Sequence, residues 1–273
     1  MTYLTTHLPF PSSSQSLPPP NSHLIISDTV ESPSHFAVYH LVSSALGKEK
    51  KKIIWVGFRG EGRQSWEAIL KKIGTPLPAI TSPQFIHISP SSLPAIIPNS
   101  TKNTPRLFNE NNEPSLKETY QNIVSNINGE GNLIILDGLS ELSWIGLTSK
   151  EISKFVRAVF SKVKSSKSIL VSTLHSDHLP LSSTIIPSKD ENENELLDNL
   201  LRLGQGCWWR VSHLHSGRSG DVMGEISSHP LTKPIGLDEN QKFPYVSRSN
   251  PLQYRLEPNT VKVFPKGTGR GFL

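Results

Sequence analysis

The stretch Ser27 to Ser34, which reads SDTVESPS, follows three apolar residues and precedes an amphipathic segment. A phosphate-binding loop of the form G-x-x-x-x-G-K-[ST] occupies such a place between a strand and a helix. In that alignment Ser27 and Ser32 stand at the two glycines. Pro33 stands at the lysine, and Ser34 keeps the final hydroxyl. The lysine supplies charge and the glycines let backbone N–H groups face phosphates, whereas proline has neither a charge nor an N–H. The stretch therefore predicts a degenerate P-loop, in a nucleotide-binding fold that has lost its chemistry.

Apolar strands alternate with amphipathic helices from His23 onward. The strands are expected at Leu24–Ile26, Ile53–Phe58, Phe85–Ile88, Leu133–Leu136 and Ile169–Thr173. Between them apolar residues recur at helical spacing, and glycine ends three of these segments, at Gly47, Gly74 and Gly129. Parallel strands that are joined by helices carry helices on both faces of their sheet. The pattern predicts an α/β fold, a three-layer sandwich around a mostly parallel central sheet.

Serine and threonine mark the expected helix starts. Ser32 is expected to cap the first helix. Ser115 with Glu118, and Thr148 with Glu151, have the spacing of a capping box, in which each member bonds the other's backbone N–H.

Both ends of the chain depart from the alternation. Residues 1–21, rich in serine and proline, are expected to form a disordered leader. Residues 22–273 are expected to form one domain, with a mobile acidic insertion at about residues 186–195. After a leucine-rich helix that ends at Gly204, strands are expected at Cys207–Leu214, Val222–Ser227, Leu252–Leu256 and Val261–Phe264. The last two form a hairpin, so antiparallel strands should extend the sheet at its C-terminal side.

Composition narrows the setting of the protein. The chain has 273 residues, a net charge of +5 and one cysteine, Cys207, so no disulfide can form within it. The mild positive charge is compatible with a nucleic-acid partner without requiring one. No run of about 18 apolar residues and no basic start followed by an apolar core occurs, which predicts a soluble protein without a membrane partner or secretory signal. The lone cysteine and the absence of such segments predict an intracellular protein.

The segment Asn132 to Ser140, NLIILDGLS, has the form of a Walker B strand. In an active NTPase, the aspartate that ends this strand helps to hold Mg²⁺. Here Asp137 ends the strand, but Gly138 follows it and the nearest carboxylate, Glu141, lies outside it. Because no other segment matches the P-loop pattern, we expect no catalytic residue, no cofactor and no ATP hydrolysis by this chain alone.

Two further groups of residues invite a binding role. His175, Asp177 and His178 follow a strand and could meet at zinc, but no further ligands appear at a familiar spacing. A polar loop is the better interpretation, and no metal is expected.

Basic residues flank glycines in two loops, RGEGR with Arg59 and Arg63, and KGTGR with Lys266 and Arg270. Arginine or lysine beside glycine suits contact with phosphates, because the backbone can approach them closely. These four residues are candidate RNA contacts.

Three features of the chain resemble one family. They are the loop SDTVESPSHF, the strand NLIILDGLS with the later strand ILVSTLH, and the closing hairpin LQYRLEPNTVKVFPKGTGRGFL. Over roughly His23 to Leu273 the chain is similar to the sixth subunit of the Elongator complex, a RecA-like protein without nucleotide motifs.

The resemblance implies a RecA-like three-layer sandwich and a non-catalytic role. It implies assembly with the fourth and fifth Elongator subunits into a six-membered ring that binds tRNA. That ring serves the catalytic Elongator subcomplex, which modifies wobble uridines and has also been tied to transcription elongation. The resemblance also implies a location in the cytoplasm and the nucleus.

Two other classes of function are possible from the sequence. A RecA-type ATPase of DNA repair would bind ATP tightly, which Pro33 argues against. A small-molecule enzyme around His175 and Asp177 would need a closed polar pocket with titratable groups that bond one another.

Overall fold

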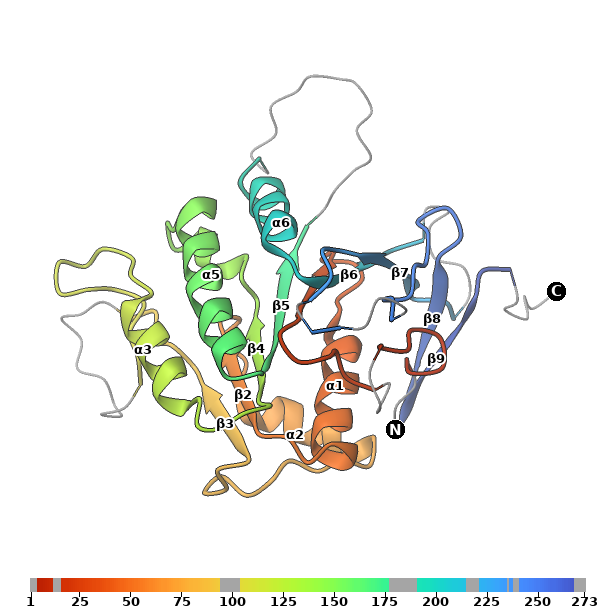
Figure 1. The fold of residues 1–273 in the computed structure, drawn as a ribbon, viewed down its shortest axis with the longest axis horizontal. Helices are drawn as coiled ribbons and strands as arrows, with labels where there is room; N and C mark the ends of the chain where they lie inside the picture. The colour runs from red at the N-terminus through yellow and green to blue at the C-terminus, as the bar shows by residue number, and fades with distance from the viewer. Residues whose placement is uncertain are drawn as a thin grey trace.

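The computed structural model describes residues 4–11, 16–93, 104–176, 191–214, 221–234, 236–237 and 241–267, the side chains of residues 191–194 excepted. The described chain is an α/β sandwich around a nine-stranded sheet (Figure 1). Its strands are β1 (His23–Asp28), β2 (Ile53–Gly57), β3 (Phe85–Ile88), β4 (Leu133–Asp137), β5 (Ile169–His175), β6 (Gly206–Ser212), β7 (Gly224–Pro230), β8 (Leu252–Glu257) and β9 (Thr260–Pro265). The expected fold class is confirmed at this level.

The strands pair in the order β3-β2-β4-β5-β1-β6-β7-β8-β9. The pairs from β3 to β6 are parallel, and those from β6 to β9 are antiparallel. The antiparallel strands therefore extend the parallel sheet at one end, as expected. The carboxyl ends of the parallel strands meet along one edge, where β5 separates β1 from β4.

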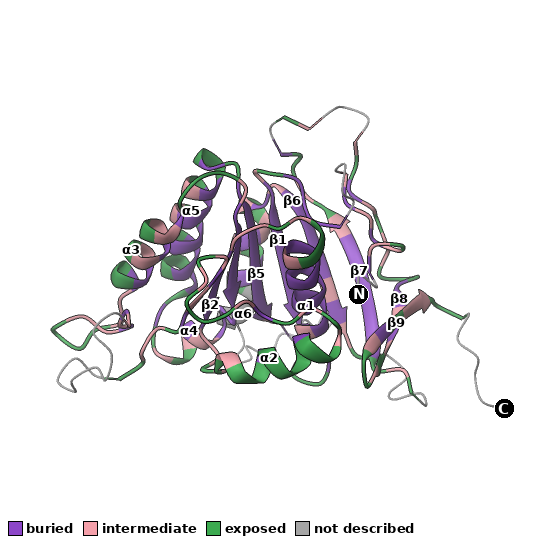
Figure 2. Ribbon diagram, turned by 90° about the horizontal axis from the view of Figure 1, so that it is seen from below, coloured by how far each residue is buried: buried purple, intermediate pink, exposed green. Residues whose placement is uncertain are grey.

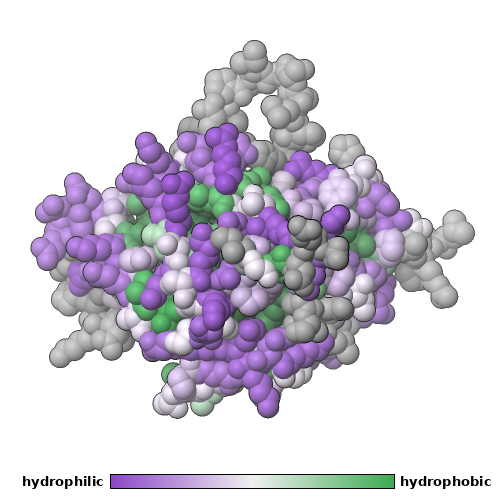
Figure 3. Space-filling model, viewed as in Figure 1, coloured by the Kyte–Doolittle hydropathy of each residue, from purple (hydrophilic) through white to green (hydrophobic). Residues whose placement is uncertain are grey.

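Helices cover both faces of the sheet. They are α1 (His35–Ser43), continued by the π-helical turn η1 (Ser44–Lys48), then α2 (Arg63–Lys72), α3 (Lys117–Asn126), α4 (Glu141–Trp144), α5 (Ser149–Ser165) and α6 (Glu191–Leu203). One apolar cluster joins the sheet to α1 and α2, and the other joins it to α3, α5 and α6. Figure 2 shows buried strands between helices, of which α2, α3 and α5 have exposed outer surfaces, whereas α1 is almost wholly buried. Hydrophilic side chains cover much of the face that Figure 3 shows, as expected for helices whose apolar stripe faces the sheet.

Two of the expected helix caps are corrected by the structure. Thr148 and Glu151 form the expected capping box, but Ser115 and Glu118 do not. Leu116 stands at the start of α3, and the Ser115 hydroxyl accepts a hydrogen bond from the backbone N–H of Lys117, at 3.4 Å. The carboxylate of Glu118 instead accepts a hydrogen bond from the backbone N–H of Arg106, at 2.8 Å. Ser34 rather than Ser32 stands at the start of α1, without a side-chain cap.

The expected disordered leader is wrong for the described residues 4–11 and 16–21. Leu4, Leu8, Phe10 and Leu17 are buried in the same apolar cluster as α1 and α2. The ring of Phe10 stacks on Trp209 with 5.3 Å between centroids. Serine and proline prevent regular structure here, but spaced apolar side chains still bury without it.

The expected acidic insertion is also corrected. Helix α6 begins at Glu191, so residues 191–195 belong to it. The carboxylate of Glu195 accepts a hydrogen bond from the Ser149 hydroxyl, at 2.5 Å. Residues 186–190 lie outside the described chain. Among the described residues, no helix has the length and apolar content that a membrane crossing requires.

Candidate functional site

The side chain of Asp28, at the end of β1, binds the donors of the loop before α1 that would face a phosphate in a working P-loop. Its Oδ2 accepts hydrogen bonds from the backbone N–H of Ser34, at 2.6 Å, and from the Ser34 hydroxyl, at 2.8 Å. In a working P-loop, such loop N–H groups and the final hydroxyl serve the nucleotide phosphates and their Mg²⁺. In this chain both Ser34 donors bind a carboxylate of the protein itself.

Arg59, just after β2, lies between two buried carboxylates. Its Nη2 is 3.7 Å from Asp28 Oδ2, and its Nε is 3.6 Å from Asp137 Oδ1. The side chains of Arg59, Asp28 and Asp137 are 9%, 0% and 2% exposed. Gly138 makes this placement possible, because it has φ +83° and a side chain there would collide with Cγ of Arg59. The arginine therefore brings positive charge to the edge where the P-loop lysine is missing.

Asp137, at the end of β4, is bound by donors from two neighbouring strands. Its Oδ1 accepts a hydrogen bond from the Thr173 hydroxyl of β5, at 2.6 Å. Its Oδ2 accepts one from Trp55 Nε1 of β2, at 3.3 Å. Both carboxylate oxygens thus accept hydrogen bonds from the protein, which fixes the orientation of this carboxylate at the end of β4.

His175, at the end of β5, joins the network from the other side. Its Nδ1 is 2.5 Å from Asp28 Oδ1, and its Nε2 is 3.9 Å from Glu141 Oε1. The Ser140 hydroxyl accepts a hydrogen bond from the backbone N–H of His175, at 2.9 Å, which ties β5 to the start of α4. We call Asp28, Arg59, Asp137 and His175 the ion network.

The charged groups of the ion network shift the pKa values of their neighbours. Burial alone would raise the pKa of Asp28, but His175, Arg59 and Ser34 together lower it below its usual value. The contact with Asp28 raises the pKa of His175 against the opposing effect of burial. Burial raises the pKa of Glu141, which Arg59 and His175 partly offset. The network therefore favours an ionised Asp28 beside a charged His175.

Replacing His175 with glutamine should lower stability in a pH-dependent way. A raised folded pKa means that the stabilisation by His175 is complete below its usual pKa of 6.5 and is lost as the pH rises through the folded value. The contribution of Asp28 has the opposite sign: it is present above its usual pKa of 3.8 and is lost as the pH falls through the lower folded value. Urea unfolding from about pH 5 to 9 should show the largest loss for His175→Gln near pH 5–6.

A matched control for this variant is His213→Gln. The His213 side chain is 53% exposed, so its loss should change stability by less than about 0.5 kcal/mol. A deficit of His175→Gln that grows as the pH rises would contradict the assigned ion pair.

The structure brings only part of the predicted nucleotide site together. Ser34 and Asp137 are linked through Asp28 and Arg59. Ser27 instead accepts a hydrogen bond from Trp208 Nε1 of β6, at 2.8 Å. The Ser32 hydroxyl donates to the carbonyl oxygen of Met223, at 3.2 Å, and Pro33 follows it without an N–H.

Two of the candidate RNA contacts are engaged inside the protein. Arg59 belongs to the ion network, and the Arg63 side chain, 14% exposed, bonds the carbonyl oxygen of Pro78 and lies 5.3 Å from the centroid of the Phe85 ring. An RNA backbone needs accessible cations, so neither arginine fits that interpretation here. Lys266 is 44% exposed and pairs with Glu225 at 3.3 Å. Arg270 lies outside the described residues.

The histidine-rich loop gives no metal site within the described chain. Asp177 and His178 lie outside it, and the described histidines, cysteine and carboxylates form no cluster of three that could hold a metal. Burial raises the pKa of the Cys207 thiol, which suits an inert core cysteine rather than a nucleophile.

Asp28, the centre of this site, was not among the residues predicted from the sequence. One signal was available, because Asp28 ends its strand as Asp137 does, and the carboxyl ends of parallel strands meet at one edge of a sheet. The comparison with family models and with curated proteins gives no match for this chain.

Proposed function

We propose that this chain is a non-catalytic RecA-like subunit that holds partner subunits together. In this proposal it is the sixth subunit of an Elongator complex, it assembles with subunits four and five into a ring, and the ring binds tRNA for wobble-uridine modification. The α/β sandwich with antiparallel C-terminal strands is compatible with a RecA-like domain. The resemblance of the loop, the Walker B-like strand and the closing hairpin supports the family.

One observation carries the non-catalytic part of the proposal. The Ser34 N–H and hydroxyl both donate to Asp28, and Arg59 lies across Asp28 and Asp137. A triphosphate at this place would have to displace an internal carboxylate and would meet its negative charge. A RecA-like body that cannot take ATP can still pack against its neighbours.

Magnesium ATP titrated into the isolated chain is expected to give no saturable signal. The lysine is absent, and the Ser34 donors are already bound to Asp28. Isothermal titration calorimetry on the wild-type chain and on Pro33→Lys tests both reasons. The lysine variant is also expected not to bind, because it leaves Asp28 in place. A micromolar dissociation constant for the wild-type chain would favour the rival ATPase and end the non-catalytic assignment.

Assembly is tested by co-expression with Elongator subunits four and five. The proposal expects one stable complex with two copies of each subunit, measured by multi-angle light scattering and native mass spectrometry. Recovery of this chain only as a monomer, under conditions where subunits four and five still associate, would contradict the assignment to the family.

A further inference from the structure

A row of aromatic rings crosses strands β6 and β7 and reaches the segment that follows them. Trp208 of β6 and His229 of β7 are cross-strand partners, with 5.1 Å between ring centroids. His229 meets Tyr245 edge to face, at 5.8 Å. Exposure increases along the row from Trp208, which is 5% exposed, to Tyr245, which is 67% exposed. A large aromatic ring thus lies open to solvent at the end of a row of contacting rings.

Arginines accompany these rings on the same side of the sheet. The Arg248 guanidinium lies 4.7 Å from the centroid of the Trp208 ring. Arg210 lies two residues after Trp208 on β6, so both side chains project from one face. Burial lowers the pKa of Arg210 and of His229, and the nearby charge of Arg248 lowers both further, whereas the carboxylate of Glu225 partly offsets the shift of Arg210. Glu225 also pairs with Lys266, at 3.3 Å. Among the described residues, no carboxylate lies within 4 Å of the Arg248 guanidinium. We call Trp208, Arg210, His229, Tyr245 and Arg248 the aromatic–cationic face.

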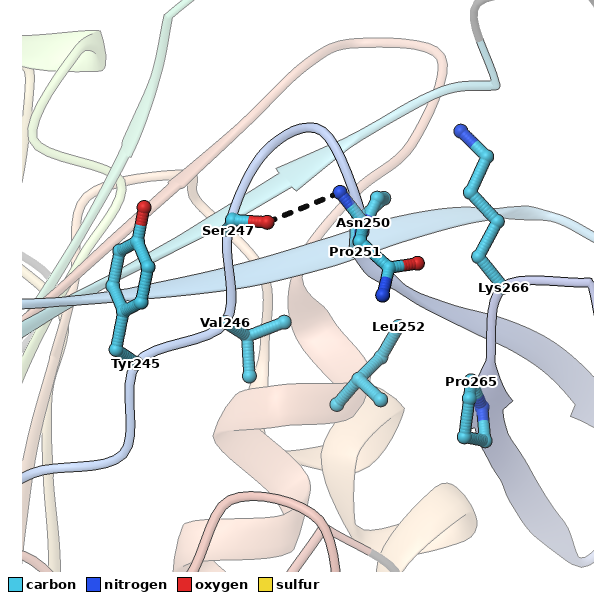
Figure 4. Close-up of a pocket in the computed structure, with 8 residues that line it drawn as sticks. All are labelled: Tyr245, Val246, Ser247, Asn250, Pro251, Leu252, Pro265 and Lys266. Atoms are coloured by element: carbon cyan, nitrogen blue, oxygen red, sulfur yellow. Dashed lines mark hydrogen bonds between the residues drawn. The ribbon is translucent and has the colours of Figure 1, made fainter.

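A cleft of about 320 Å³ opens beside Tyr245 (Figure 4). The cleft is lined by residues 245–247 and 250–252 and by Pro265 and Lys266 at the end of β9, and it presents the polar side chains of Ser247, Asn250 and Lys266. Tyr245 and Lys266 point to one side in Figure 4, whereas Val246 and Leu252 point to the other. The Ser247 hydroxyl accepts a hydrogen bond from the Asn250 N–H, at 3.2 Å, which shapes the turn between them. An exposed ring and a lysine therefore border one opening.

We propose that the aromatic–cationic face and the adjoining cleft bind single-stranded nucleic acid, with a base stacked on Tyr245 and phosphates held at Arg248 and Lys266. Stacked bases and phosphates are the two groups that such a strand offers in alternation, and aromatic rings beside cations recognise them together. The choice of RNA as the bound strand rests on the proposed function, whereas the site itself is inferred from the aromatic and basic side chains. It replaces Arg59 and Arg63 as the expected contacts, because those two arginines are bound inside the protein.

The experiment measures binding of the isolated full chain to a fluorescein-labelled oligouridine of about twelve nucleotides, by anisotropy at several salt concentrations. Arg248→Glu should weaken binding about tenfold or more and reduce the salt slope by roughly one unit. Arg157→Glu is the matched control, since it makes the same change of charge at an exposed position of α5. Tyr245→Ala should weaken binding roughly tenfold through the loss of one stack, whereas Tyr245→Phe should keep it. Thermal unfolding of each variant confirms that its fold is intact.

Several results would overturn the inference. One is the absence of saturable RNA binding by the wild-type chain at low salt. Another is an equal loss of RNA affinity for Arg157→Glu and Arg248→Glu, which would mean that RNA responds only to the net charge of the protein. A third is polyglutamate that competes as well as RNA while Tyr245→Ala binds normally, which would indicate an acidic peptide as the ligand. If the hexameric ring assembled and its Arg248→Glu form still bound RNA normally, this site would be rejected and the proposed function would stand. If the chain bound RNA specifically through this site but did not assemble with subunits four and five, the site would stand and the proposed function would be rejected.

Discussion

Replacing Arg59 with leucine is expected to lower the free energy of unfolding by about 3–5 kcal/mol, the cost of breaking a buried ion pair by removing one partner. Arg59 lies within 4 Å of both Asp28 and Asp137, whose side chains are 0% and 2% exposed. Without the guanidinium both buried carboxylates would lose a positively charged partner. Urea denaturation at neutral pH measures the loss.

Two comparisons show whether the loss at Arg59 is electrostatic. Arg59 helps to lower the pKa of Asp28 below its usual value of 3.8. The deficit of Arg59→Leu should therefore be complete at neutral pH and shrink as the pH falls below about 4, where protonation of Asp28 removes the charge that Arg59 pairs with. Arg157→Leu is the control for the loss of an arginine from an exposed helix surface and should stay within about 0.5 kcal/mol of the wild type. Equal stability of Arg59→Leu and the wild type would show that the ion network does not depend on this arginine.

Replacing Phe10 with alanine is expected to lower the free energy of unfolding by about 3 kcal/mol, at the low end for a buried phenylalanine. The ring is 3% exposed, stacks on Trp209 at 5.3 Å and meets the edge of Phe243 at 6.4 Å. Its removal leaves a cavity between the N-terminal segment and the sheet. Thermal and urea unfolding of the full chain both report this change.

The control for Phe10 lies in the same segment. Thr6 is exposed, so Thr6→Ala should change stability by less than about 0.5 kcal/mol. If Phe10→Ala were equally harmless, residues 4–11 would behave as the unpacked leader that their composition predicts, and their burial would not contribute to stability.

Much of the fold could be predicted from local sequence. Apolar runs such as Leu133–Leu136 and the helical stripe of α5 determined the alternation of strands and helices, and the capping box of Thr148 and Glu151 marked a helix start. These signals are local because hydrogen-bond geometry and side-chain periodicity act over a few residues. The predicted capping box at the start of α3 was wrong because a contact outside this local range replaced it. Glu118 accepts a hydrogen bond from the backbone N–H of Arg106, twelve residues away.

The candidate site could be predicted only in outline. The loop from Ser27 to Ser34 and the aspartate at position 137 marked the edge of the sheet that matters. Which side chains meet there could not be read from spacing, because Asp28 and His175 end two strands and Arg59 follows a third. Arg59 shows the limit clearly: its glycine-flanked loop favours a solvent-exposed phosphate contact, whereas the sheet order places it beside two buried carboxylates.

The order of residues along the chain determined that a mostly parallel sheet would form and that its first loop would lack the lysine and glycines of a phosphate site, since both depend on residue types at short range. The tertiary structure alone decided that Asp28 and Arg59 bind each other at that loop, that the serine- and proline-rich N-terminal residues pack, and that Trp208, Tyr245 and Arg248 share one face. Such meetings depend on which strands become neighbours, and strand order follows from the burial of apolar surface over the whole domain.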